Sequence, residues 1–309
     1  MKFEPCHVLG IDVGGTKIAA GVVGFPEGQI HTRHIIPTLP HRRSDAVLKD
    51  LVSLVEKIIQ QARTSGVVID GIGLGLCELV GLDGTILSGH TLSWRTAEVQ
   101  EALGQFGLVT IEADVRAAAL AEAIFGAGLP YSIFVYVTIG TGISSCLVLD
   151  GQPFPGARGA TGTIASSVIA LPCQHCGDIN RLSIEEIASG PALFRRFQQR
   201  QPDQCLSAED VLLLANEGHR DALAVVHSAA NALGSTLAQL VNVLDPEALV
   251  LGGGLGLSQG VFQEELERST RAAIWAGVNR NLPIVQASTG TDAGVIGAAA
   301  AWRAKRKLR

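Results

Sequence analysis

The chain has 309 residues, of which 47% are hydrophobic, 17% charged and 5% aromatic. This length suggests about two domains, with a core large enough to need no disulfide or metal. The formal net charge of −5 argues against a nucleic-acid partner. The sequence has neither a run of about 18 apolar residues nor a secretory signal. We therefore expect no membrane partner, a cytoplasmic location and reduced cysteines.

The first part of the chain predicts strands and helices that alternate. A helix is expected to begin at Ser44 or Asp45, because apolar residues recur on one 3.6-period face up to Ala62. A second helix is expected at 115–125. The strands expected in this part cover 7–12, 18–23, 30–36, 67–76 and 109–112.

A similar pattern returns half a chain later. The strand 133–138, a Gly/Thr turn and the strand 143–149 repeat the order strand, polar residue, turn, strand. This approximate repeat suggests two similar lobes with a cleft between them. Ser207 and Asp210 have capping-box spacing, with Asp in place of Glu. The remaining expected elements are a helix at 221–244, strands at 248–251 and 283–286, and a last helix at 292–304.

Glycine-rich turns follow three of the predicted strands. Glycine lets backbone N–H groups approach phosphate oxygens closely, although tight turns also use glycine for backbone reasons alone. Three such turns in one chain favour nucleotide binding. The candidate residues are Gly14, Gly15, Thr16 and Lys17, then Thr138, Gly140, Thr141 and Gly142, and finally Gly252, Gly253 and Gly254.

The usual nucleotide motifs are absent from the sequence. No GxxxxGK[ST] loop occurs. A strand, not a helix, follows the first two turns, unlike a dinucleotide fingerprint. A β-hairpin whose tip contacts phosphate fits this order better. Asp12, which ends its strand beside the first turn, could hold Mg²⁺ through water.

With these residues in place, the chain resembles the ROK family of bacterial sugar kinases and repressors, within the actin-like ATPase superfamily. The resemblance covers nearly the whole chain in order. The segments that carry it are Leu9-Gly-Ile-Asp-Val-Gly-Gly-Thr-Lys-Ile18, Asp83–Leu87 with Leu92-Ser-Trp94, Glu112-Ala-Asp114 with 117–122, Val137–Gly142, Gly156-Ala-Arg-Gly159, Glu186–Gly190, Val250–Gly254 and Asp292–Ala298.

The resemblance implies a two-lobed α/β fold of the actin-like ATPase (ribonuclease H-like) type, with mixed sheets flanked by helices. The lobes expected are 1–115 with 291–309, and 116–290, the second of which would bind nucleotide and form a homodimer. The implied reaction is ATP- and Mg²⁺-dependent phosphorylation of a sugar hydroxyl. Asp114 would be its general base. A helix N-cap is the alternative role for Asp114.

Several positions depart from the family pattern where the sugar would bind. The family's sugar-binding Asn, Glu and His correspond to Ala113, Thr163 and Ser166, a Pro-Gly pair to Cys77-Glu78, and a further Asn to Thr91. Each lost hydrogen bond would cost on the order of 1–3 kcal/mol. Three losses would weaken binding of an ordinary hexose by about two to six decades. We therefore expect an atypical acceptor: a modified sugar, an amino sugar or a cyclitol.

Other polar residues offer replacement contacts for such an acceptor. Arg116 could meet an acidic or phosphorylated substrate, or could be a helix-surface arginine. Glu78 could meet an amine, or could be an ordinary loop carboxylate. His90 and Thr91 offer further polar groups, and Glu185 would match the family's last sugar-binding Glu.

The zinc motif of the family is incomplete in this chain. Cys173, His175 and Cys176 could supply three ligands, but the third cysteine of the motif is missing. Structural zinc normally has four ligands, so reduced surface thiols or hydrophobic plugs are favoured over a zinc site.

Two other functions compete with a polyol kinase. The altered sugar and zinc positions would also suit a non-catalytic or degenerate ROK protein that senses a small molecule. A ROK repressor is disfavoured, because such proteins carry a DNA-binding segment before the first phosphate motif and only eleven residues precede Asp12 here. An actin- or chaperone-like ATPase is disfavoured by length and by the family resemblance.

Overall fold

The computed structural model describes residues 5–172, 175–202 and 207–307. The chain divides into two compact units. Unit 1 comprises Met1–Ser132, Cys146–Thr161 and Ala287–Arg309, and unit 2 comprises Ile133–Ser145 and Gly162–Gln286. Among the described residues, no helix combines the length and the apolar character that crossing a bilayer requires.

Unit 1 contains a five-stranded sheet in the order β3-β2-β1-β4-β5. Strand β1 is antiparallel to β2 and parallel to β4, and β4 is parallel to β5. The carboxyl ends of β1, β4 and β5 therefore lie at one edge of the sheet. The strands are β1 (Cys6–Val13), β2 (Lys17–Phe25), β3 (Gln29–Pro37), β4 (Gly71–Leu76) and β5 (Val109–Ala113).

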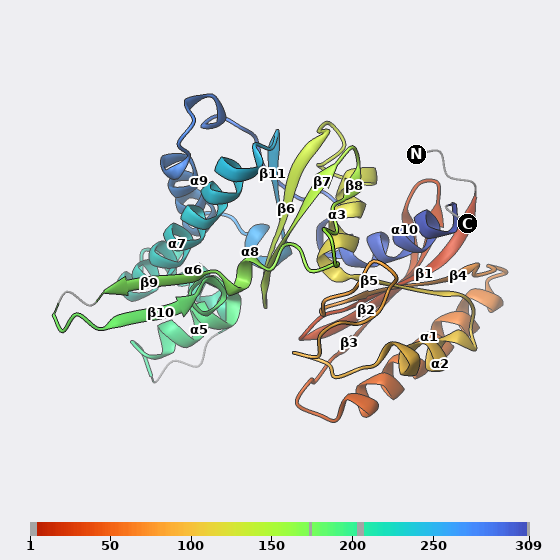
Figure 1. Ribbon diagram of the computed structural model, residues 1–309. Helices are drawn as coiled ribbons and strands as arrows, with labels where there is room; N and C mark the ends of the chain where they lie inside the picture. Colours follow the sequence, from red (N-terminus) through yellow and green to blue (C-terminus); the bar gives the residue numbers. More distant parts are fainter. Residues whose placement is uncertain (1–4, 173–174, 203–206, 308–309) are drawn as a thin grey trace. The chain divides into compact units, whose positions relative to one another are not determined.

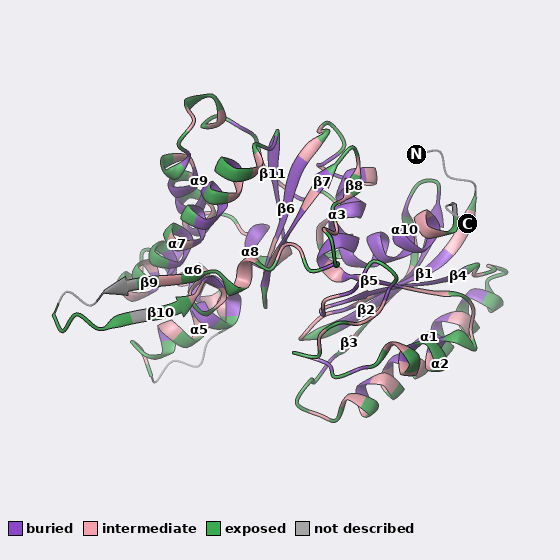
Figure 2. Ribbon diagram, viewed as in Figure 1, coloured by how far each residue is buried: buried purple, intermediate pink, exposed green. Residues whose placement is uncertain are grey.

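Helices cover both faces of this sheet (Figure 1). One face packs against α1 (Ser44–Thr64) and α2 (Thr96–Gly104), and the other against α3 (Asp114–Phe125) and α10 (Ala293–Lys307). Buried residues of the sheet lie between the two helix layers (Figure 2).

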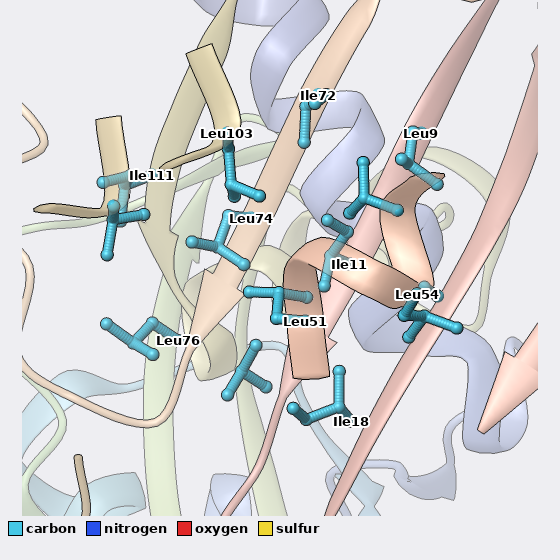
Figure 3. Packing of buried hydrophobic residues seen from close by; sticks show 14 of the residues in the cluster. Leu9, Ile11, Ile18, Leu51, Leu54, Ile72, Leu74, Leu76, Leu103 and Ile111 are labelled. Carbon is cyan, nitrogen blue, oxygen red and sulfur yellow. The ribbon is translucent and has the colours of Figure 1, made fainter. Parts of the chain in front are cut away.

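Strand β4 shows how the two faces differ, because its sequence alternates glycine with larger apolar residues. Ile72, Leu74 and Leu76 point to the α1 side, where they join the core cluster of Figure 3. The glycines of β4 alternate with them and so face α3 and α10.

Helix α10 lies close to the backbone of β1 and β4. A Cβ built on Gly73 would lie 1.9 Å from the carbonyl oxygen of Ala298, and one on Gly10 would lie 2.1 Å from that of Val295. Both neighbours are backbone atoms, which cannot turn aside as a side chain can. Glycine at these strand positions is what allows the helix to approach so closely.

Unit 2 contains most of a second sheet, in the order β12-β11-β6-β7-β8, and a two-stranded sheet of β9 and β10. Strand β11 is parallel to β6 and to β12. The bounds are β6 (Ile133–Ile139), β7 (Ile143–Leu149), β8 (Gln152–Pro153), β9 (Val168–Pro172), β10 (Ile179–Ser183), β11 (Ala248–Gly252) and β12 (Ile284–Gln286).

The helices of unit 2 include one long pair, in which α7 packs against α9. The helices are α4 (Ile184–Ala188), α5 (Gly190–Gln198), α6 (Ala208–Asn216), α7 (Arg220–Leu244), α8 (Gly253–Gly256) and α9 (Val261–Ala273), with 3₁₀ turns η1 (Ile164–Ser166) and η2 (Gly277–Asn279). A third 3₁₀ turn, η3 (Gly290–Asp292), precedes α10 in unit 1.

Most elements expected from the sequence are confirmed, including the long helix α7. The capping box before α6 is also confirmed, because Ser207 and Asp210 exchange both bonds. The strand expected at 67–76 was too long, since β4 begins only at Gly71. Helices α2, α4, α5 and α9 and the β9–β10 hairpin were not predicted. They have short or mixed polar and apolar patterns.

The compact units differ in extent from the lobes expected from the sequence. Those lobes were 1–115 with 291–309, and 116–290, whereas unit 1 also holds the rest of α3 and Cys146–Thr161. Helix α3 groups with unit 1 because it packs against α10.

We predict that Gly73→Ala lowers the free energy of unfolding by about 3 kcal/mol, in the upper range of overpacking costs. The added methyl would have to push the Ala298 backbone away from β4. Urea unfolding would measure this loss. Gly104→Ala is the matched control, because its Cβ would meet no atom within 4 Å and alanine favours a helix. Equal stability of the two variants would contradict the tight seat of α10.

Candidate functional site

Three carboxylates and a thiol lie at the carboxyl ends of β1, β4 and β5. Asp12 is the second-to-last residue of β1, Cys77 and Glu78 follow β4, and Asp114 follows β5 directly. The Cys77 N–H donates to the Val13 carbonyl oxygen at 3.0 Å, and a Cβ on Gly75 would lie 3.7 Å from the Cα of Asp114. Parallel strands thus bring residues about 100 positions apart to one edge of the sheet.

Asp114 is the first residue of α3, and the N-cap of this helix is Ala113. The alternative role of Asp114 as N-cap is therefore wrong by one residue. Its Oδ1 accepts a hydrogen bond from the N–H of the next residue, Val115, at 2.6 Å. The carboxylate is half-buried at the beginning of the helix.

The pKa values of Asp114 and Asp12 are both raised. Burial, then the negative charge of Asp12, raises the pKa of Asp114 to about 7 against the bond from Val115. Burial raises the pKa of Asp12 to about 6, although the Lys17 charge acts to lower it. The desolvated carboxylates therefore hold protons far more readily than exposed aspartates do.

Asp12 also contacts the beginning of α10. A Cβ on Gly294 would lie 2.3 Å from the Asp12 Cγ, so only glycine fits at this point of the helix. The seat of α10 on the sheet therefore also determines the space around the Asp12 carboxylate.

The first glycine turn is a tight β1–β2 connection held by Thr38. The N–H of Gly14 donates to the Lys17 carbonyl oxygen at 3.0 Å. The Thr38 hydroxyl donates to the Gly14 carbonyl oxygen at 2.7 Å, and the Thr38 N–H donates to the Thr16 carbonyl oxygen at 2.9 Å. Thr16 and Lys17 are exposed, and Gly15 is half-buried. Thr38 was missed by sequence reasoning, because no motif links it to the turn.

Glu78 is buried, and its carboxylate is fully engaged by the segment 88–92. It accepts bonds from the Ser88 hydroxyl and from the N–H groups of His90, Thr91 and Leu92, the last three at 3.0, 2.6 and 2.9 Å. Burial acts to raise the pKa of Glu78, but these four hydrogen bonds together hold it below its ordinary value. Glu78 is therefore an anion that organises a loop.

Thr91 and Cys77 lie beside Glu78. The side chain of Thr91 hydrogen-bonds with the Cys77 thiol, and burial and the charges of Asp114 and Glu78 raise the pKa of that thiol. Thr91 is half-buried, whereas His90 is exposed. Cys77 is thus a neutral thiol among the carboxylates.

Arg116 is buried within unit 1, which overturns its interpretation as a helix-surface residue. Its Nε donates to Glu112 Oε1 at 2.7 Å, Nη1 to the Gly159 carbonyl at 2.8 Å and Nη2 to the Val80 carbonyl at 2.6 Å. Arg116 is 5% exposed, so protein groups rather than a substrate use this face of the guanidinium. The structure makes it a clamp between α3 and two loops.

The second and third glycine turns approach each other within unit 2. A Cβ on Gly140 would lie 3.7 Å from the backbone nitrogen of Gly254. The Gly140 N–H donates to the Gly142 carbonyl at 2.9 Å, and its own carbonyl accepts from Gly190 at 2.8 Å. Thr141, Gly142 and Gly254 are exposed, while Thr138 and Gly253 are half-buried and Gly252 is buried.

Glu185 lies at the second turn. Its Oε2 accepts from the Ile143 N–H at 2.9 Å and would lie 2.9 Å from a Cβ on Gly142. The space beside Gly142 is therefore filled by a carboxylate, and any larger residue at 142 would displace it.

The positions that replace the family's sugar-binding residues have small side chains. Ala113 is buried in unit 1. Thr163 precedes η1 in unit 2 and Ser166 is the last residue of η1; both are exposed, and the Ser166 hydroxyl donates to the Thr163 carbonyl at 2.8 Å.

Of the three zinc candidates, Cys173 lies outside the described residues. His175 and Cys176 are exposed, and the Cys176 thiol donates to Asp178 at 3.3 Å. Within residues 5–172, 175–202 and 207–307, no group of three or more His, Cys, Asp or Glu side chains is arranged to hold a metal ion.

Comparison with known proteins gives the family. The profile described as the ROK family matches residues 8–305, and the chain belongs to this family. It is 30% identical to the N-acetylgalactosamine kinase AgaK of Shewanella sp. (strain ANA-3), over 94% of each chain. It is 28% identical to a glucokinase of Streptomyces coelicolor, covering 94% of this chain and 96% of that one.

A solved structure gives the fold class. The structure of a ROK family glucokinase from Streptomyces griseus, in complex with glucose and AMPPNP, matches with a TM-score of 0.81 at 26% identity. The match covers 95% of this chain and 98% of that chain. The prediction of an α/β fold of the actin-like ATPase class, with mixed sheets flanked by helices, is confirmed.

We predict that Arg116→Met lowers the free energy of unfolding by about 3 kcal/mol. The change removes the nearest positive charge from a largely buried Glu112, which keeps the Ala113 N–H and Lys305 at 3.6 Å, and it removes a donor from two carbonyl groups. Chemical denaturation would measure the loss. The control is Arg95→Met, which removes an exposed pair with Glu98 and should leave the unfolding midpoint unchanged. If Arg116→Met were as stable as the control, the contacts of Arg116 would not contribute to the stability of the folded protein.

Proposed function

We propose that the protein transfers the γ-phosphoryl group of ATP to a hydroxyl of an atypical polyol, with Asp114 as general base. The observation that carries this proposal is the Asp114 carboxylate at the joined carboxyl ends of β1, β4 and β5, with its pKa raised to about 7. A base with this pKa is ionised in a large fraction of molecules at neutral pH. It still binds a proton strongly enough to take one from an alcohol as the phosphoryl group arrives.

The enzyme class follows from the relatives. The chain belongs to a family in which the matched proteins are named glucokinase and N-acetylgalactosamine kinase, and a matched structure holds an ATP analogue. These likenesses support a carbohydrate kinase that uses ATP.

The glycine turns and the carboxylates have separate roles in this mechanism. Phosphoryl transfer depends on positioning and charge neutralisation. We assign the nucleotide phosphates to the glycine turns 14–17, 138–142 and 252–254, through backbone N–H groups other than those of Gly14 and Gly140, which bond within their own turns. The exposed Lys17 would add a positive charge at the first turn.

The donor set near Asp114 suits a magnesium ion. Asp12 offers hard carboxylate oxygens, and Mg²⁺ takes one or two carboxylates while it keeps several waters. Asp12 would hold the ion through water, and the bound ion would supply neutralisation of the phosphate charge.

The acceptor is proposed to be a neutral atypical polyol, such as a modified sugar or a cyclitol. Ala113, Thr163 and Ser166 provide fewer strong hydrogen bonds than the Asn, Glu and His of the family pattern. Among the polar replacements, Thr91 offers a hydroxyl group beside the carboxylates. The saturated carboxylate of Glu78 argues against an amine bound to it, so an amino sugar would need another partner for its nitrogen.

A substrate panel tests the proposal. ATP turnover is measured with glucose, N-acetylglucosamine, N-acetylgalactosamine, N-acetylmannosamine and myo-inositol, and we expect turnover of at least one polyol other than glucose. Binding of ATP without phosphorylation of any panel member would instead favour a small-molecule sensor. We also expect a cytoplasmic homodimer, which sedimentation and fractionation would test.

We predict that Asp114→Asn lowers kcat by about 10²- to 10⁴-fold, because an amide cannot accept the proton. ATP affinity, measured by calorimetry, should change little. Asp45→Asn alters an exposed aspartate in the first turn of α1 and should keep full activity. Retention of turnover by Asp114→Asn would contradict its role as the base.

We predict that activity depends on pH through this same group. Only the deprotonated Asp114 can act as base, so kcat/KM should rise with pH through about 7 and level off above it. A pH–rate profile at saturating ATP checks this. A midpoint near 4 would mean that Asp114 behaves as an ordinary exposed aspartate in the working enzyme.

A further inference from the structure

Glu78 differs from the neighbouring carboxylates because its acceptor capacity is used up within the protein. One carboxylate oxygen accepts from the Ser88 hydroxyl and the His90 N–H, and the other from the N–H groups of Thr91 and Leu92. An ionised carboxylate has about four lone-pair positions. All four donors belong to the single segment 88–92, so this buried anion binds a loop.

The segment 88–92 held by Glu78 is fixed to the core on one side and contacts residues of the candidate site on the other. Leu92 is fully buried, and the Trp94 indole N–H donates to the Ser44 carbonyl at 2.7 Å. Toward the site, the Thr91 methyl group lies 3.7 Å from the Cβ position of Gly15, and its side chain bonds with the Cys77 thiol. Thr91 thus lies between the first glycine turn and Cys77.

We propose that Glu78 is a positioning residue for the kinase reaction: it holds the segment 88–92 so that Thr91, beside Cys77 and the first glycine turn, presents its hydroxyl to a neutral polyol. This inference rests on the proposed function. Glu78 itself does not touch the acceptor, since no lone pair of its carboxylate is left for a substrate. It acts through the backbone of three consecutive residues.

The geometry explains why the acidic form is needed. The N–H groups of residues 90–92 all point at one carboxylate, and consecutive N–H groups directed at one point need an acceptor with several lone pairs. A glutamine would offer one oxygen and one NH₂ group. The NH₂ group would face two donors of the segment, which it cannot accept from.

The test compares Glu78→Gln with the unchanged protein and with Glu101→Gln, an exposed glutamate of α2. Two quantities are measured. One is amide hydrogen exchange at residues 90–92 in the full chain. The other is the steady-state kinetics with the panel polyol of highest kcat/KM. For Glu78→Gln we expect faster exchange at these amides and a KM for the polyol raised about tenfold or more, with kcat changed much less. Glu101→Gln should behave like the unchanged protein.

Ser88→Ala is the second variant, because it removes one donor and leaves the carboxylate and three N–H partners in place. It should raise the KM for the polyol by less than Glu78→Gln does. If Glu78→Gln does not fold, faster exchange at 90–92 together with a raised KM in Ser88→Ala supports the inference, and no change in either overturns it. Unchanged exchange at 90–92 in Glu78→Gln would overturn the inference, as would faster exchange with an unchanged KM.

The experiment distinguishes failure of the proposed function from failure of the inference about Glu78. If the unchanged protein phosphorylates no member of the panel, the kinase proposal is contradicted and the positioning role in catalysis falls with it. The exchange at residues 90–92 would still show whether Glu78 holds the segment.

Discussion

The close approach of α10 to β1 and β4 is the constraint on which unit 1 depends. Carbonyl groups of α10 lie where the Cβ atoms of Gly10 and Gly73 would otherwise be. The same helix begins with Gly294 against the Asp12 carboxylate, and it packs against α3, whose first residue is Asp114. The placement of this one helix, α10, therefore determines both the packing of the sheet and the surroundings of its two aspartates.

The electrostatics of the site follow from this packing. Asp12 and Asp114 are placed at the carboxyl ends of parallel strands and lose much of their contact with water, so the pKa of each rises. The negative charge of Asp12 makes ionisation of Asp114 harder, and burial contributes most to the raised pKa of both groups. An exposed aspartate in the same sequence motif would have an ordinary pKa and would be a much weaker base.

Two charged residues that could have met a substrate instead support the site. Arg116 binds Glu112 and the carbonyl groups of two loops, and Glu78 binds the segment 88–92. Both are nearly fully buried, which requires that their charges be satisfied by protein groups. Polar residues at positions that differ from the family pattern are thus used here to shape the walls of the site. The contacts left for an acceptor come from smaller neutral groups such as Thr91.

The sequence by itself determined the family, the order of most strands and helices, and the local chemistry of the glycine turns. These depend on neighbouring residues: apolar periodicity, glycine after a strand, and a carboxylate before a helix. It could not determine that Thr38 closes the first turn, that Arg116 is buried, or that Glu78 has no free acceptor. Those facts depend on partners 10 to 43 residues away. Only the tertiary structure brings these partners together, and burial then sets the ionisation of each group.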